Sequence, residues 1–280
     1  MLTRRQILIS ALTSFAGGGL LKKAKAASTK KEAHTHTKPS SEHQGRTHYT
    51  PVVTPNGSTL PYKIKNGVKE FHLIAEPVER EFAPGMKVKC WGYNGQTPGP
   101  TIEAVEGDRV RILVTNKLPE HTTIHWHGIF LPNGMDGVGG LNQPHIKPGE
   151  TYVYEFTLKQ NGTFMYHPHA DEMVQLAVGM MGFFIVHPQK PENPRIDRDF
   201  AIMLHQWAIH PGTYRPDPAV MLDFNIFTFN SKVFPDIDHL VVKTNDRVRI
   251  RIANLSMNEH PIHIHGHASV SYTHLRAHET

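Results

Sequence analysis

A stretch of sequence that occurs twice constrains the fold most. Residues 108–112 and residues 246–250 both read Asp-Arg-Val-Arg-Ile, so the two copies lie 138 positions apart. At the same offset, residues 124–128 (Ile-His-Trp-His-Gly) correspond to residues 262–266 (Ile-His-Ile-His-Gly). A repeat of this length is one whole domain, because solenoid units are much shorter. The sequence therefore predicts a tandem duplication of one domain.

Both copies consist of short apolar or alternating runs separated by Gly and Pro turns. Such runs are typical of β-strands, and no segment has a convincing long helical period. The pattern predicts an all-β chain built from β-sandwiches. The runs that we expect to form strands are 70–74, 87–91, 109–114, 151–158 and 180–186 in the first copy, and 199–207, 240–242 and 247–252 in the second.

The N-terminus has the features of an export signal. Arg4 and Arg5 precede a short, glycine-containing apolar run, and a small-x-small cleavage pattern ends at Ala26. The apolar run is too short for a membrane span, so we expect no stable span and an exported, periplasmic or extracellular protein. The expected organisation is a twin-arginine-like signal (1–26), a polar linker containing His34, His36, His43 and His48 (27–66), a first domain (67–190) and a second domain (198–269).

Charge argues against a nucleic-acid partner. The formal net charge is +5, but residues 1–31 hold seven Lys and Arg and no acidic residue. The remainder is close to neutral, which does not indicate a basic binding surface.

Histidine is the most unusual part of the composition, with 21 residues in a chain of 280. Six of them form three His-x-His pairs: His125 with His127, His167 with His169, and His263 with His265. On a strand, this spacing places both imidazoles on one face, where they can hold one metal or two neighbouring metals. A single pair could be accidental, but two of these pairs occupy matching positions of the repeat. Spacing alone leaves copper, zinc, iron and nickel open.

Three motifs resemble the copper motifs of the multicopper oxidases, the family of laccases and cuprous oxidases. They are His-Trp-His-Gly at 125–128, Tyr-His-Pro-His at 166–169, and His-Pro-Ile-His-Ile-His-Gly-His at 260–267. The resemblance implies tandem cupredoxin-like Greek-key β-sandwiches, the second incomplete. It also implies copper as the cofactor, in a trinuclear cluster. The implied ligands are His125 and His263 for the type 2 copper, His127, His167, His169 and His265 for the type 3 pair, and His260 for a type 1 copper.

The type 1 site is expected to be incomplete in this chain. The family's fourth motif, which supplies a cysteine ligand, is absent, and the single cysteine, Cys90, has no flanking histidine. We interpret Cys90 as a core residue. In the first copy, Thr122 stands where the second has His260, and Pro168 stands where a cysteine would be needed. Residues 270–280 resemble a translated sequencing adapter, so we expect a C-terminally truncated, inactive chain.

Asp136 follows the first histidine motif at a place where family members carry an Asp implicated in proton delivery to oxygen. The alternative is a turn-forming Asp-Gly pair. The remaining histidines lack a partner at ligand spacing, and we expect them to be core or surface residues.

The implied function is a multicopper oxidase that couples one-electron oxidation of a phenolic or metal-ion substrate to reduction of O2 to water. Two alternatives are a copper nitrite reductase-like enzyme and a non-enzymatic periplasmic copper-binding protein. Because the repeat offset leaves no room for a middle domain, the resemblance to two-domain relatives implies a homotrimer for the complete protein. Its other partners would be a small-molecule or metal-ion electron donor and O2.

Overall fold

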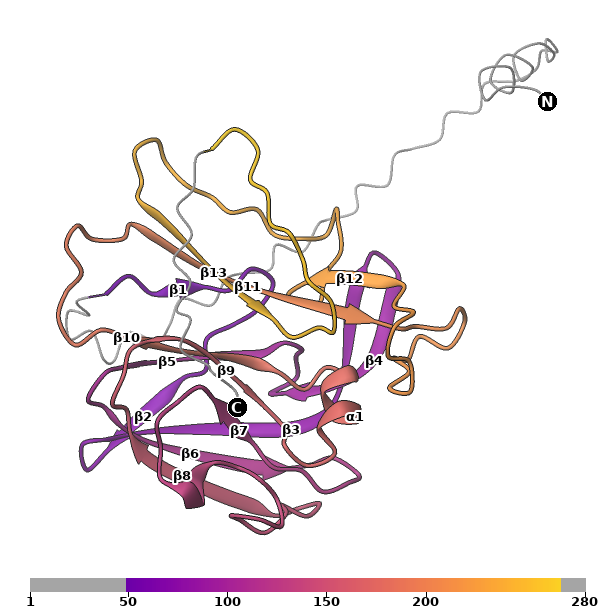
Figure 1. The fold of residues 1–280 in the computed structure, drawn as a ribbon, viewed down its shortest axis with the longest axis horizontal. Coiled ribbons are helices and arrows are strands. Elements are labelled where there is room, and N and C mark those ends of the chain that lie inside the picture. The colour runs from indigo at the N-terminus through magenta and orange to yellow at the C-terminus, as the bar shows by residue number, and fades with distance from the viewer. Residues whose placement is uncertain (1–48, 268–280) are drawn as a thin grey trace, which may run out of the picture. The chain divides into compact units, whose positions relative to one another are not determined.

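The structure is a computed structural model in which residues 49–267 are described, and all of these lie in one compact unit. The expected export signal, the four linker histidines and residues 270–280 lie outside the described residues. The described part is almost entirely β-structure, which confirms the all-β prediction (Figure 1). No helix within residues 49–267 has the length and apolar character needed to cross a lipid bilayer.

Two sheets form the first sandwich. One contains β2 (Tyr62–Lys65), β3 (Val68–Ala83), β6 (Arg109–Asn116) and β8 (Thr151–Thr157), with β4 (Met86–Tyr93) paired to β3. The other has the order β5 (Gly99–Val105), β10 (Gly182–His187), β9 (Gly162–His167) and β7 (His125–His127). A 3-10 turn, η2 (Asn133–Met135), follows β7, and one short helix, α1 (Glu172–Ala177), follows β9.

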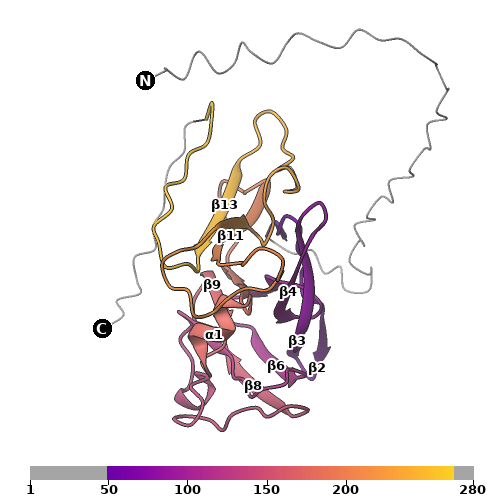
Figure 2. The same cartoon turned by 90° about the vertical axis from the view of Figure 1, so that its right-hand side faces the viewer.

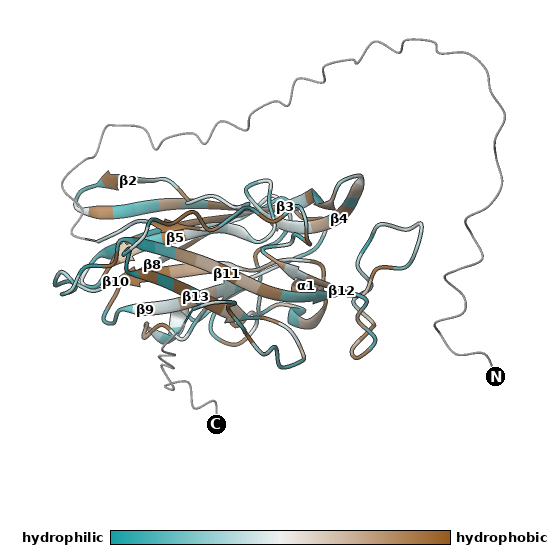
Figure 3. Cartoon of the chain, turned by 90° about the horizontal axis from the view of Figure 1, so that it is seen from above, coloured by the Kyte–Doolittle hydropathy of each residue, from teal (hydrophilic) through white to brown (hydrophobic). Residues whose placement is uncertain are grey.

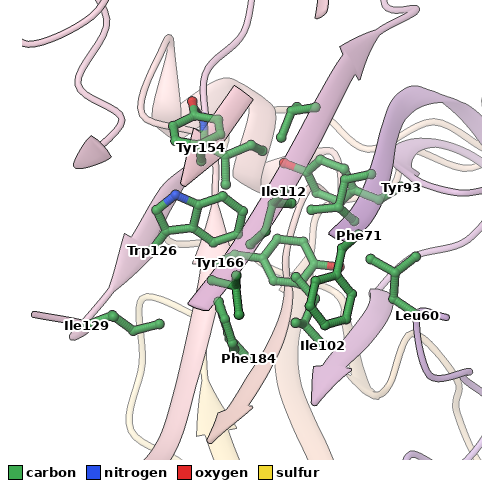
Figure 4. Close-up of a cluster of buried hydrophobic side chains, with 14 of the residues drawn as sticks. Leu60, Phe71, Tyr93, Ile102, Ile112, Trp126, Ile129, Tyr154, Tyr166 and Phe184 are labelled. Carbon is green, nitrogen blue, oxygen red and sulfur yellow. Dashed lines mark hydrogen bonds between the residues drawn. The ribbon is translucent and has the colours of Figure 1, made fainter. Parts of the chain in front are cut away.

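The core of the first sandwich lies between these two sheets, as Figure 4 shows for its largest side chains. Alternation along the strands explains why. In β6, Val110, Ile112 and Val114 are fully buried, whereas Arg111 on the other face pairs with Glu155, with Nε and Oε2 2.6 Å apart. The same alternation is visible as bands of hydropathy in Figure 3.

A second sheet-on-sheet core joins the first sandwich to the second copy. The second copy contributes β11 (Arg198–Trp207), β12 (Ile226–Phe229) and β13 (Val248–Asn254) to a sheet that also includes β1 (Val52–Val53). Strand β10 is buried on both faces: Phe184 points into the first core and Phe183 into the second. The sheet that contains β10 therefore packs against both of the other sheets (Figures 1 and 2).

The two copies of the repeat have matching backbone arrangements. Strand β3 pairs with β6 in parallel, with Lys69 opposite Val110, and β11 pairs with β13 in parallel, with Arg198 opposite Val248. Each copy also has a tight turn at an asparagine, Asn94 directly after β4 and Asn230 directly after β12, and both residues have φ of 51°. Each Asn side-chain oxygen accepts a backbone N–H from the adjoining strand, from Ile74 at 3.0 Å and from Met203 at 2.8 Å. The duplication therefore extends to hydrogen bonding.

Two expectations are wrong. Residues 49–66 were expected to belong to a polar linker, but they contain β1 and β2, which pair with β11 and β3. Their anchors are single buried residues, Val52 and Leu60, spaced too far apart to produce an apolar period. Residues 240–242 form no strand, and Val241 is 72% exposed, because no described strand lies alongside them.

Candidate metal centre

Strand β7 presents two histidines on one face. His125 and His127 are half-buried, whereas Trp126 between them is fully buried on the opposite face. The Trp126 ring packs against Tyr154 at 5.2 Å and Phe184 at 5.9 Å, measured between ring centroids (Figure 4). The core therefore fixes Trp126, and strand alternation turns both imidazoles outward together.

Strand β9 brings a third histidine to this face. His167 lies opposite His125 in the antiparallel register of β7 and β9. His167 Nε2 lies 3.2 Å from His127 Nδ1. Two imidazole nitrogens bound to one ion at about 2.0 Å lie about 3.3 Å apart when the geometry is near tetrahedral. Among the described residues, His125, His127 and His167 are the group of three whose ligand atoms all lie within 4.8 Å of one another.

Hydrogen bonds determine which ring nitrogens remain free to bind a metal. His167 Nδ1 lies 2.9 Å from the Pro168 carbonyl oxygen, and His125 Nδ1 lies 2.8 Å from the Asp136 carbonyl oxygen. A carbonyl oxygen can only accept, so both Nδ1 atoms carry the proton and Nε2 keeps its lone pair. Burial lowers the pKa of His167 to about 4. His167 is therefore neutral at pH 7, which is the form that binds metal ions.

His169 belongs to the cluster but not to the strand. Strand β9 ends at His167, so the expectation that strand alternation would align His167 and His169 is wrong. Pro168 has no N–H to continue the ladder. His169 instead approaches His125, with ring centroids 5.2 Å apart, and its backbone N–H donates to Thr123 Oγ1 at 3.3 Å. Four of the predicted ligand residues are thereby gathered at one end of the first sandwich.

Asp136 is held beside His125 by the turn after β7. Its carboxylate Oδ1 lies 3.5 Å from His125 Nδ1, in addition to the contact of its carbonyl oxygen. The next residue, Gly137, has φ of +91°, and a Cβ there would lie 1.8 Å from the Ile124 carbonyl oxygen. The turn therefore packs directly on the backbone that leads into β7, which requires glycine.

The histidines of the third motif do not belong to the group formed by His125, His127 and His167 within the described residues. His263 and His265 are exposed and follow β13 in a segment without strand structure, with their rings 4.7 Å apart. His260 is half-buried; its Nε2 lies 2.7 Å from Ser256 Oγ, and its ring lies 6.1 Å from Phe227. Within residues 49–267, no metal-binding group of three includes these histidines.

The comparisons with known proteins agree with the histidine pattern. Two family models described as multicopper oxidase match residues 75–191 and 210–274. Copper resistance protein A from Escherichia coli is 46% identical over 123 residues, which cover 44% of this chain and 20% of that protein. A probable nitrite reductase-hydroxylamine oxidoreductase fusion protein from Kuenenia stuttgartiensis is 29% identical over 214 residues, which cover 72% of this chain and 25% of that protein.

One solved structure matches this chain over most of the length of both chains. It is a crystal structure of a multicopper oxidase, 33% identical, with a TM-score of 0.60, and the match covers 74% of this chain and 69% of that chain. The chain belongs to the multicopper oxidase family. Multicopper oxidases bind copper, so copper is the metal to consider at the histidine cluster. The chain spans only 20% of the length of its Escherichia coli relative.

Where the repeat aligns Thr122 with His260, the first multicopper oxidase domain has a hydroxyl in place of an imidazole. Thr122 is fully buried, and its hydroxyl lies 2.7 Å from Gln175 Oε1. Cys90 lies in β4, is 2% exposed and packs in the second core. Burial raises the pKa of its thiol to about 12, which agrees with the prediction that it is a core residue.

Sequence reasoning missed one acidic residue of this multicopper oxidase site. Glu172, the first residue of α1, lies beside both His167 and His169. Its position three residues after His169 was the available signal, but the sharp turn at Asp171 that brings the two side chains together is not evident from spacing.

Proposed function

We propose that the complete protein couples one-electron oxidation of a phenolic or metal-ion substrate to reduction of O2 to water. The observation that carries this proposal is the approach of His127 Nδ1 to His167 Nε2 at 3.2 Å in a chain of the multicopper oxidase family. Copper, when bound, supplies the one-electron chemistry that protein side chains lack. The residues supply neutral imidazoles held by a packed strand.

In this proposal, His125 with His263 holds the type 2 copper, and His127, His167, His169 and His265 hold the type 3 pair. His260 would be one ligand of a type 1 copper. Asp136 would hold a proton at its carboxylate, beside His125, for delivery to oxygen. The contact of 3.5 Å between Asp136 Oδ1 and His125 Nδ1 supports that role.

A copper titration of the 280-residue chain tests the ligand assignment. Replacing His167 with Ala should weaken copper binding by at least about tenfold, because the variant loses one of the imidazoles that bind copper directly in this proposal. The matched control is His72→Ala, since His72 lies on β3, where its Nε2 contacts Thr115 Oγ1. Equal copper affinity of His167→Ala and the unsubstituted chain would refute the assignment.

The position of the single cysteine bears on whether this chain can act as an oxidase by itself. With Cys90 buried in β4, His260 has no thiolate partner within residues 49–267. We therefore expect the 280-residue chain to show no intense blue thiolate-to-copper absorption and negligible turnover. An intensely blue, active 280-residue protein would overturn this part of the proposal.

A nitrite reductase remains the alternative that a relative's name supports. Pro168 argues against it, because that family places a type 1 cysteine in the first domain. Assaying the complete protein for O2 consumption and for nitrite reduction separates the two functions. We further propose export, with removal of residues 1–26; N-terminal sequencing of the mature protein checks the cleavage site.

A further inference from the structure

Glu172 lies between the two histidines of the second motif. Its Oε1 lies 3.4 Å from His167 Nδ1, and its Oε2 lies 3.8 Å from His169 Nε2. The carboxylate thus spans both rings, which are themselves stacked with centroids 6.4 Å apart. Glu172 remains 41% exposed, so its charge is not forced into an apolar interior.

The start of α1 is fixed by a buried glutamine. Gln175 is fully buried: its Nε2 donates to the His121 carbonyl oxygen at 2.8 Å, and its Oε1 lies 2.7 Å from Thr122 Oγ1. Its backbone N–H donates to the Asp171 carbonyl oxygen at 3.0 Å, which closes the first turn after Asp171. Asp171 has φ of +48°, a conformation that turns the chain sharply from His169 into the helix. The position of Glu172 therefore follows from packing.

We propose that Glu172 is a positioning residue that holds His167 and His169 for copper; this inference rests on the proposed ligand assignment. His167 Nε2 faces His127, so the ring carries its proton on Nδ1. That N–H needs a hydrogen-bond acceptor on the opposite side of the ring. The Pro168 carbonyl oxygen accepts it, and the carboxylate beside it adds a negative charge that favours the Nδ1–H form.

The second carboxylate oxygen has a separate effect on His169. That ring is 35% exposed and has no strand to fix it, so the charge of Glu172 limits its rotation. The carboxylate also offsets the positive charge of copper held by neutral imidazoles. Both effects depend on charge, so an amide of the same shape should not replace them.

The test compares copper affinity of the 280-residue chain and three variants, by competition with a chromophoric copper chelator. Glu172→Ala should weaken copper binding by about 10- to 100-fold, the range typical for outer-shell partners of metal-bound histidine. Glu172→Gln should be weakened nearly as much, whereas Glu120→Gln, which removes an exposed carboxylate elsewhere on the domain, should bind as the unsubstituted chain does.

Two further readouts separate the possible failures. Thermal unfolding of the metal-free variants reports folding, and nitrogen-15 spectra of histidine report whether His167 keeps its proton on Nδ1. The proposal expects Glu172→Gln to keep its melting temperature and the His167 Nδ1–H held by the Pro168 carbonyl oxygen, so that its weaker copper binding reports the lost charge. Equal copper affinity of Glu172→Gln and the unsubstituted chain would overturn the role of Glu172. Absence of copper binding by the unsubstituted chain would instead refute the proposed function.

Discussion

At the scale of single residues, burial controls how the histidines respond to acid. His205, in β11, is 5% exposed, and its Nδ1 donates to the Leu255 carbonyl oxygen. Burial lowers the pKa of His205 to about 4. An unfolded histidine titrates near its ordinary value of 6.5, so between pH 6.5 and pH 4 the unfolded chain binds the extra proton and the folded chain does not.

The free energy of unfolding should therefore fall as pH drops from 7 to 4, by roughly 3 kcal/mol for this group. Replacing His205 with Gln removes the titrating group and should flatten this part of the profile. Urea denaturation at several pH values measures the effect, with His210→Gln as the exposed control. An unchanged slope for His205→Gln would assign the acid sensitivity to other groups.

Cys90 gives a second prediction at the same scale. Because the pKa of its buried thiol is raised to about 12, the native protein should resist thiol reagents at pH 8. The thiol should react fully once urea unfolds the chain. Absorbance with a disulfide reagent, in the presence and absence of urea, measures both states. Rapid labelling of the native protein would contradict the buried position.

The histidine cluster could be predicted because ligand spacing is local in sequence, as at His125 and His127. The contacts of Glu172 and the stacking of His169 could not, because they depend on where Pro168 ends β9 and how α1 starts. The start of α1 is set by the buried Gln175, whose partners lie 53 and 54 residues away.

At the scale of elements, the turn after β7 determines how His125 is held. Gly137→Ala would place a Cβ 1.8 Å from the Ile124 carbonyl oxygen, in a backbone conformation that disfavours side chains. We expect a loss of at least about 2 kcal/mol in stability and weaker copper binding. Gly134→Ala, in the same turn, meets no atom within 4 Å and should leave both unchanged. Chemical denaturation and copper titration check the pair of variants.

A buried ion pair joins two strands of the second copy, and its arginine also contacts the first copy. Arg251 in β13 binds Asp199 in β11 through two contacts of 2.8 Å, and its Nη1 donates to Thr163 in β9 at 2.7 Å. Arg251→Met leaves the buried Asp199 with only Arg249, whose Nη1 lies 3.5 Å from Oδ2, and should cost up to about 3–5 kcal/mol. The exposed pair Lys87–Glu79 provides the control, since Lys87→Met should change stability by less than about 1 kcal/mol. A small effect of Arg251→Met on urea denaturation would contradict this.

Most strands could be predicted from alternation, as in β6, where one face packs on a core, or from an apolar run, as in β11, which is buried at most positions. Strands β1 and β2 could not: β1 has two residues and pairs with the distant β11, and β2 pairs with the neighbouring β3 but is exposed at all four positions, so neither shows alternation. Their positions are determined by long-range contacts such as that of the Val52 N–H with Glu103 Oε2 at 3.1 Å.

At the scale of the whole molecule, the proposed copper sites combine histidines of the first domain with His263 and His265 of the second. We predict that the complete protein is a homotrimer in which His263 and His265 of one subunit meet the first domain of its neighbour. His263 and His265 do not join the group of His125, His127 and His167 within the described residues, which supports this prediction. Light scattering of the copper-loaded protein measures the mass; an active monomer with a full cluster would refute the trimer.

Strand β1 has a consequence for synthesis of the chain. A hydrogen bond joins Thr50 to Ile196, 146 positions later, and Val52 pairs beside Asp199. At 5–20 residues per second, about 7–30 s pass between translation of β1 and translation of its partner. The apolar face of β10 that carries Phe183 is made near the end of that interval and lacks its covering sheet until β11 and β13 follow. Nascent chains that stop short of residue 200 should therefore be the ones that ribosome-associated chaperones retain longest.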